Sequence, residues 1–113
     1  MFFAAGPFEA CLTNRSLNVV VPEERCVSVG YGSYEAMLDT LEGAISATEY
    51  VAGAHFSAAD VYVGSHIAWG MQAGTVEKRP AFSAYLQRLS QRPAYQRAAE
   101  LDNILIAQMR ASA

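Results

Sequence analysis

The sequence predicts an all-α fold, a bundle of about five helices with a buried central helix that starts near Ser57. Apolar residues recur at intervals of three and four along much of the chain, which is the spacing of one face of an α-helix. No stretch shows the strict alternation, bounded by turn residues, that marks a β-strand. Residues 61–76 carry no Asp, Glu, Lys or Arg. A helix that is apolar on every side is usually enclosed by other helices, so this segment is the predicted centre.

The composition is that of one globular domain spanning residues 1–113. Of these residues 52% are hydrophobic and 17% are charged, with a net charge of −3. The longest basic feature is the pair Lys78 and Arg79, which we expect to lie in solvent. Phosphate binding needs clustered cations, so no nucleic-acid partner is expected. We also expect no membrane association and, because the apolar start lacks the basic stretch of a signal peptide, a cytoplasmic protein.

The two cysteines carry no metal or redox motif. Cys11 and Cys26 are too few and too far apart for a zinc cluster or a C-x-x-C pair. We interpret each as a small buried side chain, with a disulfide between them as the alternative. No metal site is expected.

The first helix is predicted over residues 2–12, with a kink at Gly6-Pro7. Its expected buried positions are Phe2, Phe3, Phe8, Cys11 and Leu12. Nothing ahead of Phe2 can serve as a cap, so we expect this helix to be truncated at the start of the chain. Residues 14–30 have no helical period and are interpreted as a loop.

Three amphipathic helices are predicted around the central one. The first has apolar residues at helical spacing, Tyr34, Met37, Leu38, Leu41, Ala44 and Ile45. A second is expected to begin at Pro80 and to stop at Pro93, with a buried face of Phe82, Tyr85, Leu86 and Leu89. Pro93 then opens the last helix, whose expected buried face is Tyr95, Ala98, Leu101, Leu105 and Met109.

Residues 56–61, F-S-A-A-D-V, carry two signals for the start of the central helix. With Ser57 as the N-cap, its hydroxyl can accept from the Asp60 amide while the Asp60 carboxylate accepts from the Ser57 amide. Phe56 and Val61 can pack together as a hydrophobic staple. We therefore predict a structural role for Asp60. Within the helix, Gly64, Gly70 and Gly74 are expected to allow close approach of neighbouring chain.

These features together resemble the C-terminal, all-helical domain of bacterial glutathione S-transferases. The capped central helix follows an amphipathic helix and precedes P-A-F-x-A-Y-L-x-R-L-x-x-R-P-A-Y-Q-R-A. In that family a Ser-x-x-Asp box and its staple open the core helix, and Ser57, Asp60, Phe56 and Val61 match them. The segment R-P-A-Y at residues 92–95 matches the family's closing turn. The resemblance covers nearly the whole chain.

The resemblance implies a role in conjugating glutathione, the co-substrate, to electrophiles during detoxification. The glutathione site and the activating residue belong to a thioredoxin-like N-terminal domain, and no β-α-β pattern here could supply them. We therefore expect no catalytic residue and no cofactor in this chain alone. The helical domain is expected to contribute a wall of the electrophile pocket, from its first helix and its core helix, and the contacts of a homodimer. The alternative is a stand-alone interaction module without catalysis.

Three aromatic residues are candidates for the electrophile pocket. Trp69 matches by position an aromatic residue that lines the pocket in some relatives, and a tryptophan in the core is the other interpretation. Phe2 and Phe3 lie in the first helix, where a core or interdomain position is the alternative. Ser65 and His66 are adjacent residues that do not share a helix face, so they are a poor nucleophile and base. We expect His66 to be a hydrogen-bonded core histidine.

Overall fold

Helices and their connections make up the whole chain, of which a computed structural model describes all residues from 1 to 113. The α-helices are α1 (Glu9–Ser16), α2 (Tyr34–Ala47), α3 (Ala58–Ala73), α4 (Pro80–Ser90) and α5 (Pro93–Ala111). A π-helical turn, η1 (Ala4–Phe8), leads into α1, and a 3-10 helix, η2 (Glu23–Val29), lies between α1 and α2. The predicted all-α class is confirmed, with no strand beyond an isolated bridge between Tyr50 and Gly53.

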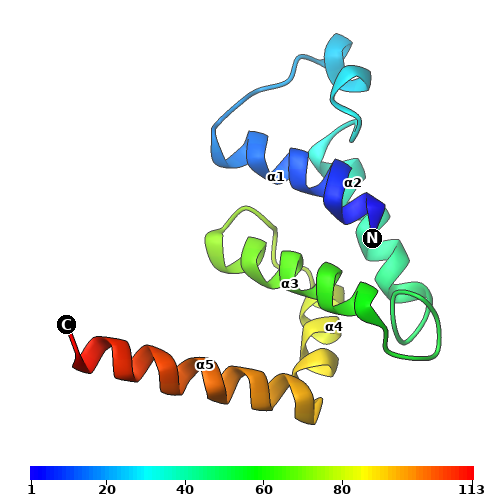
Figure 1. The fold of residues 1–113 in the computed structure, drawn as a ribbon. Coiled ribbons are helices and arrows are strands. Elements are labelled where there is room, and N and C mark those ends of the chain that lie inside the picture. Colours follow the sequence, from blue (N-terminus) through cyan, green and yellow to red (C-terminus); the bar gives the residue numbers. More distant parts are fainter.

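Helix α4 connects the other helices of the bundle. It packs against both α2 and α3, and η1 packs against α3 as well. Figure 1 shows α1 beside α3, and Leu12 of α1 reaches the backbone of α3 at Gly70. Helix α5 packs on α4 near its start and then runs away from the bundle (Figure 1).

The core combines residues from η1, α1, α2, α3 and α4. Its buried members are Ala4, Phe8, Cys11, Met37, Leu38, Leu41, Ile45, Val63, Ile67, Val76, Phe82, Tyr85 and Leu89. The apolar faces predicted for α2 and α4 supply seven of these residues, because their three-and-four spacing gathers them on one side of each helix. Pro80 and Pro93 occupy the first turns of α4 and α5, as predicted.

The predicted kink near Gly6-Pro7 is a π-helical turn that contains Pro7. A wider turn changes which residues share a face, and here Ala4, Phe8 and Cys11 are buried. Phe2 is 93% exposed, so its predicted burial is wrong. Phe3 packs against the core in part. In the predicted loop, η2 adds a short 3-10 helix, and α1 continues to Ser16.

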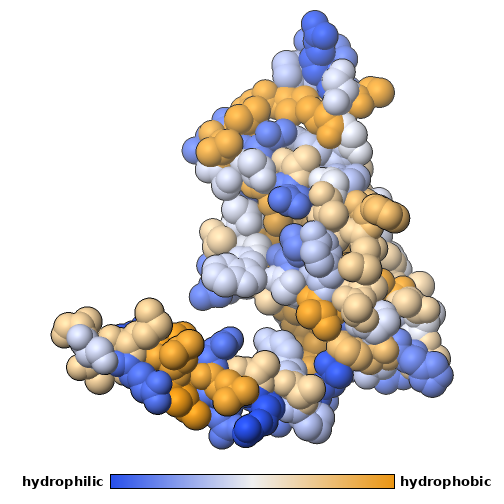
Figure 2. All heavy atoms as spheres, viewed as in Figure 1, coloured by the Kyte–Doolittle hydropathy of each residue, from blue (hydrophilic) through white to orange (hydrophobic).

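The predicted burial is also wrong along α5 and along one side of α3. No residue of α5 is buried, although its helix lies where predicted, because no other element covers its apolar side. Figure 2 shows hydrophobic residues gathered along α5 at the lower left, apart from the rest of the molecule. In α3, Val61 and Trp69 are exposed, because the neighbouring helices leave these two side chains uncovered.

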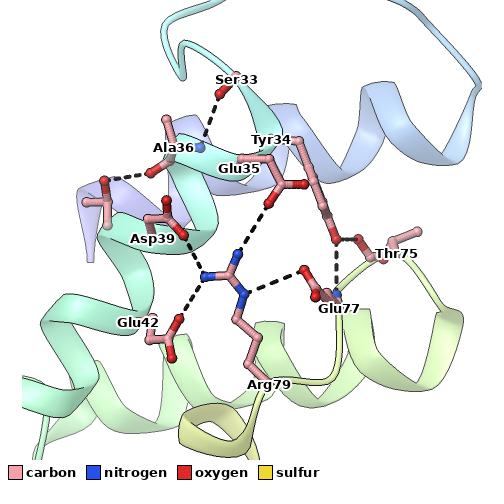
Figure 3. A network of polar contacts seen from close by, with 10 residues as sticks. Ser33, Tyr34, Glu35, Ala36, Asp39, Glu42, Thr75, Glu77 and Arg79 are labelled. Atoms are coloured by element: carbon pink, nitrogen blue, oxygen red, sulfur yellow. Dashed lines mark hydrogen bonds and ion pairs between the residues drawn. The ribbon is translucent and has the colours of Figure 1, made fainter.

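Arg79, expected in solvent, instead joins α2 to the segment before α4. Its side chain is 14% exposed, and its guanidinium contacts Asp39 and Glu42 at 2.7 Å and Glu35 at 3.3 Å. Glu77 lies at 3.6 Å (Figure 3). Hydrogen bonds to Asp39 and Glu42 raise the pKa of Arg79 further above its usual value. Charges on one face of α2 are thus matched by a cation forty residues away.

Tyr34 makes a second connection between the same two segments (Figure 3). Its hydroxyl donates to the Thr75 carbonyl at 3.0 Å and accepts from the Glu77 amide at 3.0 Å. The guanidinium of Arg15, from α1, lies 4.0 Å from the centre of the Tyr34 ring. The start of α2 is therefore fixed to α1 and to the turn that follows α3.

Candidate functional site

Ser57 and Asp60 have the geometry of a capping box at the start of α3. The Ser57 amide donates to Oδ2 of Asp60 at 2.9 Å, which is the bond predicted for the carboxylate. The Ser57 hydroxyl lies 3.4 Å from the same oxygen, and the Asp60 amide donates to the Ser57 carbonyl at 3.0 Å, so the bond predicted from this amide to the Ser57 hydroxyl stays a prediction. Because these groups satisfy donors that a helix start leaves free, α3 begins where the sequence predicts.

Asp60 also has two partners that the sequence does not reveal. Its Oδ1 accepts from the Val51 amide at 2.9 Å and from the Tyr85 hydroxyl at 2.8 Å. The side chain is fully buried, and its partners are neutral donors. Burial, and then the bond to Asp60, raise the pKa of Tyr85 above its ordinary value. Asp60 thus connects the start of α3 with α4 and with the loop before α3, which supports a structural role.

Phe56 packs at the same helix start, against residues other than the predicted one. Its ring meets Tyr50 edge to face at 6.0 Å, and the Arg92 guanidinium lies over it. Val61 borders the same small hollow as Phe56 but is 60% exposed. The staple between Phe56 and Val61 stays a prediction.

A cleft of about 390 Å³ lies between α1 and α3. Its volume falls in the range of small-molecule sites, which is about 300–1,000 Å³. The residues that line it are Glu9, Leu12, Thr13, Ser16, Ser65, His66, Trp69, Gly70, Ala73 and Thr75. The glycine matters here, because a Cβ at Gly70 would lie 2.2 Å from Cγ2 of Val76 and 3.3 Å from Leu12. Gly70 therefore allows α1 and the turn after α3 to approach closely, as expected.

Of the three pocket candidates, only Trp69 lines this cleft. Its side chain is 72% exposed, so it is not a core tryptophan. It also borders the smaller hollow formed by α3, α4 and the start of α5. Phe2 and Phe3 are not among the lining residues of the cleft.

Ser65 and His66 line the cleft without forming a catalytic pair. Both contact the Tyr62 carbonyl one turn earlier, Ser65 through its hydroxyl and His66 through Nδ1, each at 2.9 Å. The expected hydrogen bond of His66 is present, but the ring is half-buried at the cleft and not in the core. Neither side chain activates the other.

The thiols and acidic groups elsewhere form no reactive centre. Cys11 and Cys26 are both free, and burial raises the pKa of the Cys11 thiol. A raised pKa lowers the fraction of the nucleophilic thiolate. No three His, Cys, Asp or Glu side chains converge in a way that could hold a metal ion. None of the helices combines the length and apolar character needed to cross a membrane.

The fold and the cleft define an all-α domain whose central helix is anchored by a buried aspartate. The family described as glutathione S-transferase, C-terminal domain, matches residues 12–93. This is well over half of the chain, which therefore belongs to that family. No curated protein and no solved structure gives a significant match. The resemblance found in the sequence is confirmed for the family, whereas its bacterial type stays a prediction.

Proposed function

We propose that this chain forms one wall of the electrophile pocket of a glutathione transferase, and that the wall is the cleft between α1 and α3. Glutathione and the residue that activates its thiol would be supplied by a thioredoxin-like domain. The family assignment supports the class of reaction. The cleft lies between the first helix and the core helix, the two elements from which such a wall was expected.

The exposed indole of Trp69 is the observation that carries this proposal. Large aromatic side chains are favoured in interiors, and one left 72% exposed beside a cleft offers a flat apolar surface to a ligand. Phe2 and Phe3 can line the electrophile pocket only if another domain completes the pocket beside them. The buried Asp60 lies about two and a half turns before Trp69 along α3 and holds the helix that presents the indole.

The test uses Trp69 as its own reporter, because it is the only tryptophan in the chain. Titration with the aromatic electrophile 1-chloro-2,4-dinitrobenzene should quench its fluorescence to saturation. An Ala73→Phe variant, which fills the cleft, should weaken this binding, whereas Ala98→Phe on exposed α5 should not. Quenching that rises linearly and equally in all three proteins would contradict the proposal.

We further propose that the protein acts as a homodimer in the cytoplasm. Four exposed apolar residues on α5 form what we call the α5 apolar row: Leu101, Ile104, Leu105 and Met109. A contiguous apolar surface of this kind favours cover by a second protein surface. The free state of both cysteines supports a reducing compartment.

The same α5 apolar row favours the second candidate function, an interaction module without catalysis. The two functions differ at the cleft. A module requires the row to bind a partner while the cleft binds no aromatic electrophile. Saturable binding at Trp69 together with loss of self-association in a row variant supports the transferase role.

A further inference from the structure

The cleft between α1 and α3 is rich in hydrogen-bond acceptors, and its donors are the Thr13 hydroxyl and the indole N–H of Trp69. Three hydroxyls on its wall already donate their protons to backbone carbonyls: Ser16 to Thr13 at 2.8 Å, Ser65 to Tyr62 at 2.9 Å and Thr75 to Gly70 at 3.3 Å. A hydroxyl that donates elsewhere keeps only its lone pairs for a ligand. Glu9 adds a carboxylate, and no Lys or Arg lines the cleft.

In its uncharged form, the ring of His66 adds another acceptor. Its Nδ1 lies 2.9 Å from the Tyr62 carbonyl oxygen, which can only accept, so Nδ1 carries the proton and Nε2 keeps a lone pair. The Nε2 atom makes no hydrogen bond within the chain, whereas every buried side-chain nitrogen or oxygen atom has a hydrogen-bond partner. Nε2 is therefore accessible. The rings of Tyr62 and Phe8, at 4.5 and 6.0 Å, fix the plane of the imidazole.

An aromatic surface lies next to this acceptor. Trp69 follows His66 by three residues on α3, so the two side chains are neighbours on one helix face, and both line the cleft. A ring placed on the indole would bring a substituent within reach of the imidazole. A carboxylate substituent would instead meet the charge of Glu9.

We propose that His66 selects the second substrate, an aromatic compound that carries a hydroxyl or N–H group, by accepting a hydrogen bond at Nε2 while the ring packs on Trp69. The inference rests on the proposed function, because it takes this cleft to be the electrophile wall. His66 is a specificity-determining residue here and takes no part in activating the thiol. The carboxylate of Glu9 on the same wall disfavours aromatic compounds that carry a carboxylate.

The test compares three ligands of one shape on the unmodified chain. Calorimetric titrations would use 3-nitrophenol, kept protonated by the choice of pH, 3-nitroanisole, which lacks the donor, and 3-nitrobenzoate, which is an anion. One hydrogen bond should favour the phenol over the anisole about 5- to 10-fold. The benzoate should bind weakest.

Variants then assign the preference to its residue. His66→Phe keeps a flat ring but removes the acceptor, so it should bring the phenol down to the affinity of the anisole. His55→Phe is the matched control, because His55 is exposed in a loop and does not line the cleft. Should His66→Phe fail to fold, the ¹⁵N shift of Nε2 in the unmodified chain gives a second measurement. It should move with the phenol and stay unchanged with the anisole.

The outcomes separate this inference from the function beneath it. Equal affinities for phenol and anisole, both weakened by Trp69→Ala, would overturn the role of His66 and leave the electrophile wall standing. Tightest binding of the benzoate would overturn it as well. No binding of any of the three, or binding that Trp69→Ala does not change, would remove the proposed function itself.

Discussion

The hydroxyl of Tyr85 donates a 2.8 Å hydrogen bond to Oδ1 of Asp60, and both side chains are buried. The bond joins α4 to the start of α3 across 25 residues of sequence. Asp60 has further donors in the Ser57 and Val51 amides. A buried carboxylate is tolerated only when its oxygens are satisfied, so this tyrosine is part of what allows α3 to begin inside the fold.

Replacing Tyr85 with Phe should therefore lower the free energy of unfolding. The change removes one donor to a buried charged group, for which a loss of about 1.5–3 kcal/mol is expected. Urea denaturation would measure it. Tyr95→Phe is the control, because the Tyr95 ring is half exposed and its hydroxyl makes no hydrogen bond within the chain. Equal stability of the two variants would refute the importance of the bond.

The same bond predicts a loss of stability at alkaline pH. Burial and the Asp60 carboxylate raise the pKa of Tyr85 in the folded state, while in the unfolded chain it stays near its ordinary value of about 10. Between these two values the folded state binds more protons, so its stability falls as pH rises above about 10 and is fully retained below. Melting temperatures across this window should fall less steeply in Tyr85→Phe. A slope identical to that of the unmodified chain would disprove the linkage.

Arg79→Gln should weaken the contact between α2 and the start of α4. The variant leaves Glu35, Asp39 and Glu42 close together without a cation. Several partly exposed pairs at under about 1 kcal/mol each give an expected loss of about 1–2 kcal/mol. The loss should shrink at high salt, because added ions screen the remaining carboxylates. Lys78→Gln, one residue earlier and exposed, should change little, and a comparable loss there would count against the network.

Alanine at two helical glycines should change stability in opposite directions. At Gly70 a Cβ would lie 2.2 Å from Cγ2 of buried Val76, a β-branched residue that cannot easily move aside, so Gly70→Ala should cost about 1–3 kcal/mol. At Gly43, inside α2, no atom lies within 4 Å of the added Cβ. Gly43→Ala should stabilise by about 0.5–1 kcal/mol through helix propensity. Chemical denaturation of both variants would show whether close approach at Gly70 is required.

Leu105→Glu should change association and hydrophobic dye binding but not the stability of the single chain. Leu105 is 56% exposed in the α5 apolar row, so its removal costs the fold less than about 0.5 kcal/mol. Leu38→Ala in the core should by contrast cost about 2–5 kcal/mol. Sedimentation velocity and dye fluorescence would report on the row. If the unmodified chain is a stable monomer with low dye binding, the α5 apolar row needs no partner surface.

Helix starts could be predicted because their signals are local. Ser57, Pro80 and Pro93 each act through atoms within one turn, so the sequence places α3, α4 and α5 correctly. The three-and-four spacing likewise identifies the apolar sides of α2 and α4, which are the sides that are buried. The family could be recognised for the same reason, since its marks are a local box and a local turn.

The cleft and its chemistry could not be predicted in this way. Periodicity shows that Val61, Trp69 and Leu105 are apolar, but not whether another element covers them, and all three are exposed. Apart from Glu77, the partners of Arg79 and Tyr85 are 25 to 44 residues away, and no local pattern joins them. The π-turn at Pro7 changes which residues share a helix face, so the burial predicted for Phe2 from regular helical spacing is wrong.

The sequence by itself determined that α2 to α5 are helical, where α3 to α5 begin and which sides of the helices are apolar, because backbone capping and side-chain spacing are short-range effects. Tertiary packing decided what those sides meet. It buried Asp60 with Tyr85, left Trp69 open beside α1, and exposed α5. The physical reason is that burial is a property of pairs of surfaces, and a single helix carries information about only one of them.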